Sequence, residues 1–134
     1  MIRVAAICLA LGLSFPVRSQ ELLQPEIAFQ PTAHYVDART LEVRYRIAPG
    51  YYLYREKFAF KAGEKKLGKA KFPKGKIKDD PFFGRVEIYR EALSIRLPVV
   101  QAEEGMTLEA TSQGCADIGI CYPPVTQHLK VLKP

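Results

Sequence analysis

The stretch TLEVRYRI, residues 40–47, decides the fold class of this 134-residue chain. Leu, Val, Tyr and Ile occupy every second position from 41 to 47, and charged side chains fill the positions between them. A period of two residues is typical of a β-strand with one buried face. Shorter segments with the same pattern are found at 86–90, 93–99, 106–111 and 128–132. We find no window of ten or more residues with a convincing helical stripe.

Turn-forming residues separate these segments. The turn signals are Pro49-Gly50, Ala62-Gly63, Pro73-Lys74-Gly75, Gly84 and Gly105. Short strands with a turn signal about every eight to twelve residues predict an all-β antiparallel sandwich or barrel. The length suits a single domain. The 48% of hydrophobic residues argues against a disordered chain.

Residues 1–19 have the pattern of a secretory signal peptide. Arg3 precedes an apolar run from Val4 to Leu13, and the small residues Val17 and Ser19 come shortly before Gln20. The run is too short to span a membrane as a helix. We therefore expect export and a mature domain of residues 20–134.

Removal of residues 1–19 would change the charge and the cysteine count. The loss of two arginines and no acid lowers the net charge from +6 to +4. Cys8 is lost as well, which leaves Cys115 and Cys121. In an oxidising compartment these two cysteines can pair with no odd thiol remaining.

The two cysteines lie in the stretch GCADIGICYPP, residues 114–124, which allows three interpretations. A structural disulfide is one, and two cysteines facing each other across antiparallel strands would be within bonding range. A loop this short gives only about 2–2.5 kcal/mol of stabilisation in the chain-entropy model. A metal site is disfavoured, because His34 and His128 are the only histidines and the cysteine spacing is unusual for zinc.

The third interpretation is a reversible, redox-active disulfide. A short loop suits this role because its opening need not unfold the domain. Reactivity depends on thiolate formation and on access, which sequence does not reveal. The spacing also differs from C-x-x-C, and the chain lacks a βαβ pattern. Spacing and composition therefore leave the structural and redox interpretations open.

Residues 61–78 contain eight lysines and one acid, Glu64. The segment could bind an anionic partner, either a membrane surface or nucleic acid. It could also be a solvated hairpin whose lysines prevent edge strands from pairing with other chains. We favour the hairpin, because no aromatic ladder accompanies the lysines, and we expect no nucleic-acid partner.

Three motifs together resemble the N-terminal periplasmic domain of the thiol:disulfide interchange protein DsbD. They are PGYYLYREKF (49–58), DDPFFGRVEIYR (79–90) and GCADIGICYPP (114–124), and their order and separation also fit. The resemblance covers essentially all of the mature chain. It implies an immunoglobulin-like antiparallel β-sandwich with a catalytic cysteine pair on two strands near one end.

The resemblance also implies a function, that of a periplasmic thiol:disulfide oxidoreductase of the protein-disulfide reductase type, with no cofactor. A membrane-embedded electron donor, in cis or in trans, would reduce the disulfide. The dithiol would then reduce thioredoxin-fold periplasmic proteins, such as disulfide isomerases and the thioredoxin-like protein of cytochrome c maturation. Cys121 would attack the partner and form the mixed disulfide, and Cys115 would be the resolving thiol.

The family has a cap loop that covers the cysteine pair between partners. An aromatic ring over a disulfide excludes competing thiols, and a glycine allows such a loop to move. Phe82 would be the shielding ring. The matching residues here are Asp80, Pro81, Phe82, Phe83 and Gly84.

Other side chains are expected to line the site. Tyr52 and Tyr54 match family tyrosines, and their alternation places them on one face of a strand, where a hydroxyl could bond near the sulfurs. Asp117 and Tyr122 flank the cysteines in sequence and are further candidates. Asp80 and Asp117 could accept a proton or influence a thiol, and a carboxylate near a thiol raises its pKa.

The chain departs from the family pattern in two ways. Phe83 stands where relatives often have tyrosine, and Pro81 stands where they often have a second acid. Pro81 stiffens the entry to the cap and removes one possible proton acceptor, which weakens a general-base role for the cap. The family protein also continues into a membrane domain and a thioredoxin-like domain, so a chain ending at Pro134 is either a stand-alone version or a piece of a longer protein. The alternative function is a non-catalytic secreted binding or chaperone sandwich with a passive disulfide.

Overall fold

The computed structural model describes residues 14–16 and 21–133. Cys8 and all but residues 14–16 of the expected signal peptide lie outside the described residues. The elements, in chain order, are α1 (Pro25–Ala28), β1 (Phe29–Asp37), β2 (Thr40–Ile47), β3 (Tyr51–Tyr54), the 3₁₀ turn η1 (Arg55–Lys57), β4 (Ala59–Lys61), β5 (Lys76–Asp80), β6 (Gly84–Tyr89), β7 (Ala92–Pro98), β8 (Thr107–Ser112), β9 (Gly114–Ala116), β10 (Ile120–Cys121) and β11 (Val125–Lys130).

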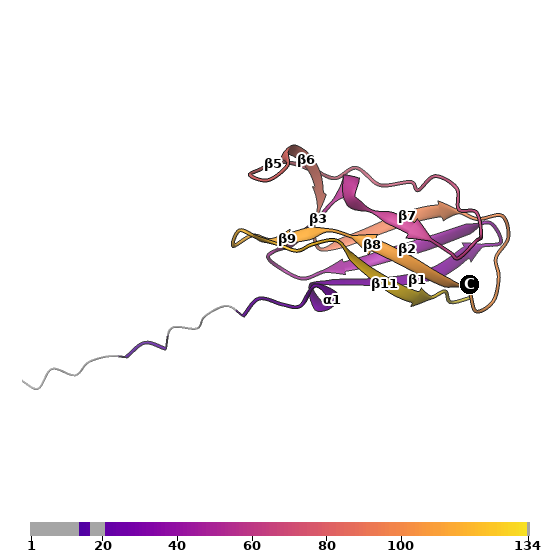
Figure 1. Ribbon diagram of the computed structural model, residues 1–134, viewed down its shortest axis with the longest axis horizontal. Helices are drawn as coiled ribbons and strands as arrows, with labels where there is room; N and C mark the ends of the chain where they lie inside the picture. Colours follow the sequence, from indigo (N-terminus) through magenta and orange to yellow (C-terminus); the bar gives the residue numbers. More distant parts are fainter. Residues whose placement is uncertain (1–13, 17–20, 134) are drawn as a thin grey trace, which may run out of the picture.

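The strands form three antiparallel sheets. One has the order β1-β2-β7, the second β10-β9-β3-β6-β5, and the third β11-β8-β4. Figure 1 shows the β5–β6 hairpin projecting at the same end of the domain as β9, while the last strand, β11, runs toward the opposite end. The arrangement is an immunoglobulin-like β-sandwich, which confirms the expected fold class.

The main core lies between the sheets and is built from the alternating positions of the long strands. Leu41, Val43 and Tyr45 of β2 are almost completely buried, together with Ile95 and Leu97 of β7. The charged side chains between them face the other side of the sheet. The alternation in residues 40–47 therefore predicted both the bounds of β2 and its buried face.

Most other predicted strands are confirmed with small shifts. The segments at 86–90, 93–99 and 106–111 correspond to β6, β7 and β8. The segment predicted at 128–132 is shifted, because β11 begins at Val125 and pairs with β8 from Val125↔Ser112 to Lys130↔Thr107. Cross-strand pairing extends this strand into the polar residues Thr126 and Gln127, which the hydrophobic pattern does not predict.

The lysine-rich segment is not the expected hairpin. After β4 it runs along the edge of β7, with Gly68 N–H donating to Pro98 O and with two hydrogen bonds between the backbones of Lys71 and Arg96. It reaches β5 only at Lys76. The edge of β7 is thus protected by paired backbone rather than by lysine charge alone. Seven of the eight lysines are exposed.

Within the described ranges, no helix is long and apolar enough to cross a membrane.

Candidate active site around the Cys115–Cys121 disulfide

Strand β3, with the sequence YYLY, is buried on both faces. Tyr51 and Leu53 belong to the main core. Tyr52 and Tyr54 point the other way and form a second, smaller cluster with Ile88 and Cys115. Because adjacent side chains of a strand face opposite sides, this short strand joins the core to the cysteine site.

The cysteines lie opposite each other on β9 and β10. Cys115 pairs with Cys121 in the register of the two strands. Tyr122 N–H donates to Gly114 O at 3.0 Å, so the cysteines occupy the neighbouring non-hydrogen-bonded position, where strands approach most closely. They form a disulfide with a Cα–Cα distance of 4.0 Å.

The two sulfur-bearing residues differ in exposure. Cys115 is 0% exposed. Cys121 lies on the edge strand of its sheet and is partly exposed. Of the two halves of the disulfide, only Cys121 therefore offers a surface to another molecule.

Close backbone packing fixes the position of Cys115. The preceding residue, Gly114, pairs with Leu53 of β3. A Cβ at Gly114 would collide with the carbonyl oxygen of Tyr52 and would lie 2.7 Å from the Phe29 ring. The absence of a side chain at residue 114 thus allows β9 to lie directly against β3.

The Tyr54 hydroxyl connects the disulfide to Asp80. It lies 2.9 Å from Cys115 Sγ and 3.7 Å from Cys121 Sγ. It also donates to Asp80 Oδ2 at 2.7 Å. A hydroxyl has one proton, so it presents a lone pair to the sulfur when it donates to the carboxylate. The expectation that a tyrosine hydroxyl would bond near the sulfurs agrees with this geometry.

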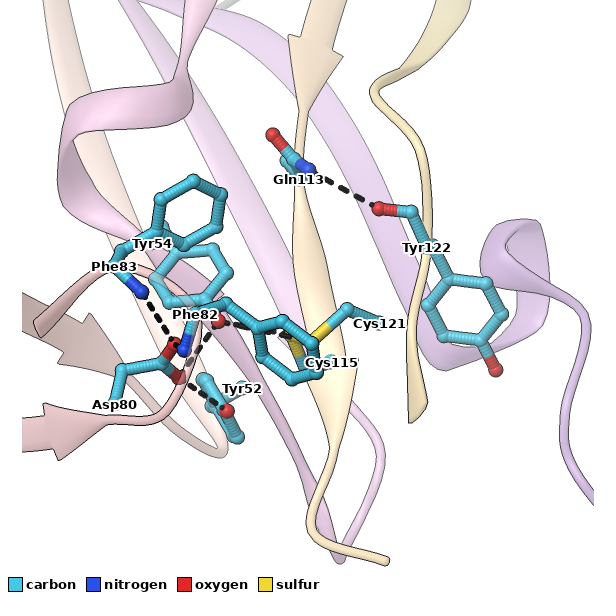
Figure 2. The surroundings of a disulfide bond; sticks show 9 residues. All are labelled: Tyr52, Tyr54, Asp80, Phe82, Phe83, Gln113, Cys115, Cys121 and Tyr122. Atoms are coloured by element: carbon cyan, nitrogen blue, oxygen red, sulfur yellow. Dashed lines mark hydrogen bonds between the residues drawn. A yellow bond between two sulfur atoms is a disulfide. The ribbon is translucent and has the colours of Figure 1, made fainter. Parts of the chain in front are cut away.

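Asp80 is only 5% exposed and accepts four hydrogen bonds. The Tyr52 hydroxyl donates to Oδ2 at 2.8 Å, as Tyr54 does, and the backbone N–H groups of Phe82 and Phe83 donate to Oδ1 at 2.8 and 3.0 Å. Figure 2 shows how these bonds join the cap loop to the two tyrosines. Asp80 contacts the sulfurs only through Tyr54.

These contacts determine the ionisation of the site. Burial opposes a charge on Asp80, but the hydrogen bonds from Tyr54, Phe82 N–H, Tyr52 and Phe83 N–H outweigh it and hold the pKa below the ordinary value of 3.8. Burial and the bond to Asp80 raise the pKa of Tyr54 far above its ordinary value. At neutral pH the site therefore contains a carboxylate and a neutral phenol.

The cap loop follows Asp80 and turns at Gly84, whose φ of 73° suits glycine. The Phe83 ring packs edge-on against Tyr54 at 5.0 Å between centroids, and Lys57 Nζ lies 4.6 Å from its centroid. The Phe82 side chain is 60% exposed and, in Figure 2, extends from the loop toward the disulfide. Pro81 is exposed at the tip of the loop.

Two candidate residues do not contact the sulfurs. Asp117 forms an ion pair with Arg90 beyond the end of β9. Tyr122 points away from the sulfurs in Figure 2, stacks on Tyr51 and donates a hydrogen bond to Leu23 O. Burial raises the pKa of Tyr122 to about 12. Tyr122 directly follows Cys121 and so faces the opposite side, whereas Asp117 lies in the turn after β9. Proximity in the sequence therefore places neither side chain beside the sulfurs.

Arg90 is a residue that sequence reasoning missed. It belongs to the motif DDPFFGRVEIYR, but nothing in the local sequence distinguishes it from the other arginines of the chain. Its role depends on Asp117, which is distant in sequence. In the described part of the chain, no group of three or more His, Cys, Asp and Glu side chains is placed to hold a metal ion.

Comparison with known proteins agrees with this geometry. The sequence model of the family described as "Thiol:disulfide interchange protein DsbD, N-terminal" matches residues 19–133. The chain belongs to this family. It is 43% identical over 123 residues to the DsbD protein of Ralstonia nicotianae, which is 89% of the chain and 20% of that protein. It is 40% identical over 122 residues to the Neisseria meningitidis protein, with 90% and 20% covered.

Solved structures of DsbD N-terminal domains are similar as well. The crystal structure of the reduced N. meningitidis domain has a TM-score of 0.75 at 40% identity, covering 83% of this chain and 90% of that one. The complex between the DsbD N-terminal and PilB N-terminal domains of the same organism has a TM-score of 0.69 at 38% identity, covering 84% and 88%. The chain spans about a fifth or less of the length of the curated DsbD relatives it matches.

Proposed function

We propose that this DsbD-type domain is a periplasmic protein-disulfide reductase module. It passes reducing equivalents from a membrane-embedded donor to thioredoxin-fold partners through Cys115 and Cys121. The observation that carries the proposal is the asymmetry of the pair, in which Cys115 is buried against the Tyr54 hydroxyl and Cys121 is partly exposed. A disulfide with a purely structural role does not require one accessible sulfur and one protected sulfur.

The exchange proceeds in two steps that transfer two electrons and two protons. In the dithiol form, the Cys121 thiolate attacks a sulfur of the partner's disulfide, and the other partner sulfur leaves and takes up a proton. The Cys115 thiol then loses its proton, and its sulfur attacks Cys121 Sγ. This attack breaks the mixed disulfide, reforms the Cys115–Cys121 bond and releases the second partner sulfur as a thiol. The donor restores the dithiol by the reverse chemistry.

The hydrogen bonds around Tyr54 support this division of roles. Because the Tyr54 proton lies on the Asp80 side, the hydroxyl can accept a hydrogen bond from the Cys115 S–H once the disulfide is reduced. A bond to the neutral thiol, together with burial, favours the thiol form of Cys115. The first attack then falls to Cys121, and Cys115 waits as a protected thiol.

The cap loop is proposed to limit access between reactions. Phe82 is the shielding ring, since it is exposed and extends toward the disulfide, whereas Phe83 packs on Tyr54 and anchors the loop. Opening would move Phe82 while the Asp80 bonds to the two tyrosines hold the base of the loop. With Pro81 at the tip and Asp80 bound by four donors, no cap residue is free to act as a general base.

The partner class is inferred from the family. A related domain from N. meningitidis forms a complex with the PilB N-terminal domain, which is an example of a protein that docks on this fold. We extend the proposal to disulfide isomerases and to the thioredoxin-like protein of cytochrome c maturation. Export through residues 1–19 would place the chain in the compartment where such partners occur.

Single-cysteine variants test the proposal. The reduced protein is mixed with an oxidised thioredoxin-fold disulfide isomerase, and the partner's thiols are counted over time. Cys121→Ser should abolish reduction of the partner. Cys115→Ser should accumulate a mixed disulfide with the partner, visible as a covalent complex on a non-reducing gel. Partner reduction at the wild-type rate by both variants would refute the relay.

A further inference from the structure

Arg90 ties the tip of the active-site hairpin to the rest of the domain. It directly follows β6, and its guanidinium binds both oxygens of Asp117, with Nη1–Oδ2 and Nη2–Oδ1 distances of 3.0 and 2.9 Å. Asp117 directly follows β9 and opens the turn that leads to β10. A bidentate pair of this kind fixes orientation as well as distance.

The same guanidinium lies over the Tyr52 ring, 5.1 Å from its centroid. Lys78 Nζ lies 5.3 Å from that centroid. Tyr52 in turn donates its hydroxyl proton to Asp80. Arg90 therefore contacts both the hairpin that carries the cysteines and the tyrosine cluster beside them, although it touches neither sulfur.

The backbone beside Arg90 is unusual. Glu91 has φ of 65°, and it is the one non-glycine residue with positive φ among those the structure describes. The turn is held by hydrogen bonds from Ala92 N–H to Arg90 O at 2.8 Å and from Ile47 N–H to Glu91 O at 2.7 Å. Backbone conformations of this kind persist only where the surrounding structure enforces them. Here β6 ends at Tyr89, and the turn begins at Arg90.

We infer that Arg90 is a positioning residue that sets the reduction potential of the Cys115–Cys121 pair by holding Asp117 and the hairpin in place. This inference rests on the proposed function. In the disulfide form, the S–S bond itself holds β10 against β9. Because β10 has only two residues, the clamp between Arg90 and Asp117 helps to keep the sulfurs within reacting distance once the S–S bond is broken.

The expected change in reduction potential follows from the effective concentration of one cysteine thiol at the other. Reduction by glutathione consumes two thiols and gives one glutathione disulfide, while the protein disulfide gains two electrons and two protons. The equilibrium depends on how readily the two protein thiols meet again. Loss of the clamp lowers their effective concentration, so the disulfide becomes easier to reduce. A role in general stability alone, equal in both redox states, would leave the equilibrium unchanged.

The chain offers a matched control in Arg55. Arg55 Nη1 lies 2.8 Å from Glu87 Oε2, and its guanidinium lies 5.6 Å from the Phe72 ring centroid. Its side chain is 31% exposed, against 32% for Arg90. Each arginine thus binds one carboxylate and faces one aromatic ring, but none of the contacts of Arg55 reaches the β9–β10 hairpin.

The test measures the equilibrium of each purified protein with a glutathione redox couple or, if the wild-type potential lies below about −300 mV, with the more reducing dithiothreitol couple. Arg90→Lys and Asp117→Asn should each shift the equilibrium about three- to tenfold toward the dithiol. That is about 15–30 mV more positive for a two-electron couple. The double variant should show no further shift, because both changes break one pair. Arg55→Lys should remain within twofold of the wild type.

The inference is overturned if Arg90→Lys and Asp117→Asn both remain within twofold of the wild type, or if Arg55→Lys shifts equally. Asp117→Asn removes the ion pair but leaves Arg90 over Tyr52, so it provides the answer if Arg90→Lys fails to fold. Failure of the proposed function is a separate result, in which the wild-type protein itself does not reduce the partner.

Discussion

The Tyr54 hydroxyl oxygen lies 2.9 Å from the sulfur of Cys115, the buried half of the disulfide. The same hydroxyl donates to the buried carboxylate of Asp80, so one side chain couples the buried cysteine to the start of the loop 80–84.

Tyr54→Phe removes the hydroxyl between Cys115 and Asp80. We expect the free energy of unfolding to fall by about 1.5–3 kcal/mol, because a hydrogen bond to a buried carboxylate is lost. Tyr45→Phe is the matched control. The Tyr45 hydroxyl is also buried, but it lies near Ser112 without a hydrogen bond of good geometry, so its removal should cost much less. Urea unfolding measures both, and equal losses would contradict the assigned contacts.

The ionisation of Asp80 predicts a pH dependence of stability. Its pKa in the folded protein is below the ordinary value of 3.8, so its contribution is present above that value and is lost as the pH falls through the folded pKa. Asp80→Asn should therefore be less stable than the wild type at about pH 7, and the gap should narrow below about pH 4. Exposed Asp79, changed to Asn, serves as the control. If the difference in free energy of unfolding between Asp80→Asn and the wild type stays constant down to about pH 2, ionisation of the Asp80 carboxylate is not the cause of that difference.

The shielding role of Phe82 can be separated from folding. Phe82 is 60% exposed, so Phe82→Ala should change the free energy of unfolding by no more than about 0.5 kcal/mol. The same change should speed reduction of the disulfide by dithiothreitol about three- to tenfold, because a small thiol reaches Cys121 more easily. Exposed Val100, changed to Ala, should leave this rate unaltered. A wild-type rate for Phe82→Ala would rule out the shield.

Gly114 allows β9 to pack on β3, so Gly114→Ala should be strongly destabilising. Its Cβ would meet the carbonyl oxygen of Tyr52, whose strand β3 is held between β9 and β6. Overpacking of this kind costs about 1–3 kcal/mol. Gly119 provides the comparison, since an added Cβ there meets nothing within 4 Å but must adopt φ of 94°. We expect a smaller loss of about 1 kcal/mol at Gly119. Thermal unfolding of both variants shows which one loses more stability, and a larger loss of stability for the Gly119 variant would contradict the prediction.

The sequence predicted those strands whose hydrophobic alternation can be seen within the strand itself. The strict alternation of residues 40–47 marked β2, because its hydrophobic side chains lie in the core and its charged side chains lie on the other face. On that face Glu42 is buried by ion pairs with Arg44 and Arg96. β1 was missed, since Pro31 interrupts its pattern, and a proline is tolerated there because β1 is an edge strand of its sheet. The start of β11 was missed because it is determined by pairing with β8, which is not a local property.

The same distinction applies to the candidate site. The alternation of Tyr52 and Tyr54 correctly predicted a shared face, and the resemblance pointed to Cys115, Cys121 and the loop 80–84 as candidates. Asp117 was expected near the sulfurs from its place in the sequence, yet its partner is Arg90, 27 residues away. Contacts between distant segments depend on the three-dimensional arrangement, so neither spacing nor residue type alone predicts them.

The reduction potential of the Cys115–Cys121 disulfide tests the central claim most directly. The purified protein is equilibrated in glutathione buffers of graded ratio, and its free thiols are quantified by alkylation. A relay disulfide should equilibrate with these buffers and have a potential above about −300 mV. A potential below about −300 mV, with resistance to glutathione, would contradict the account and favour a passive structural disulfide in a non-catalytic sandwich.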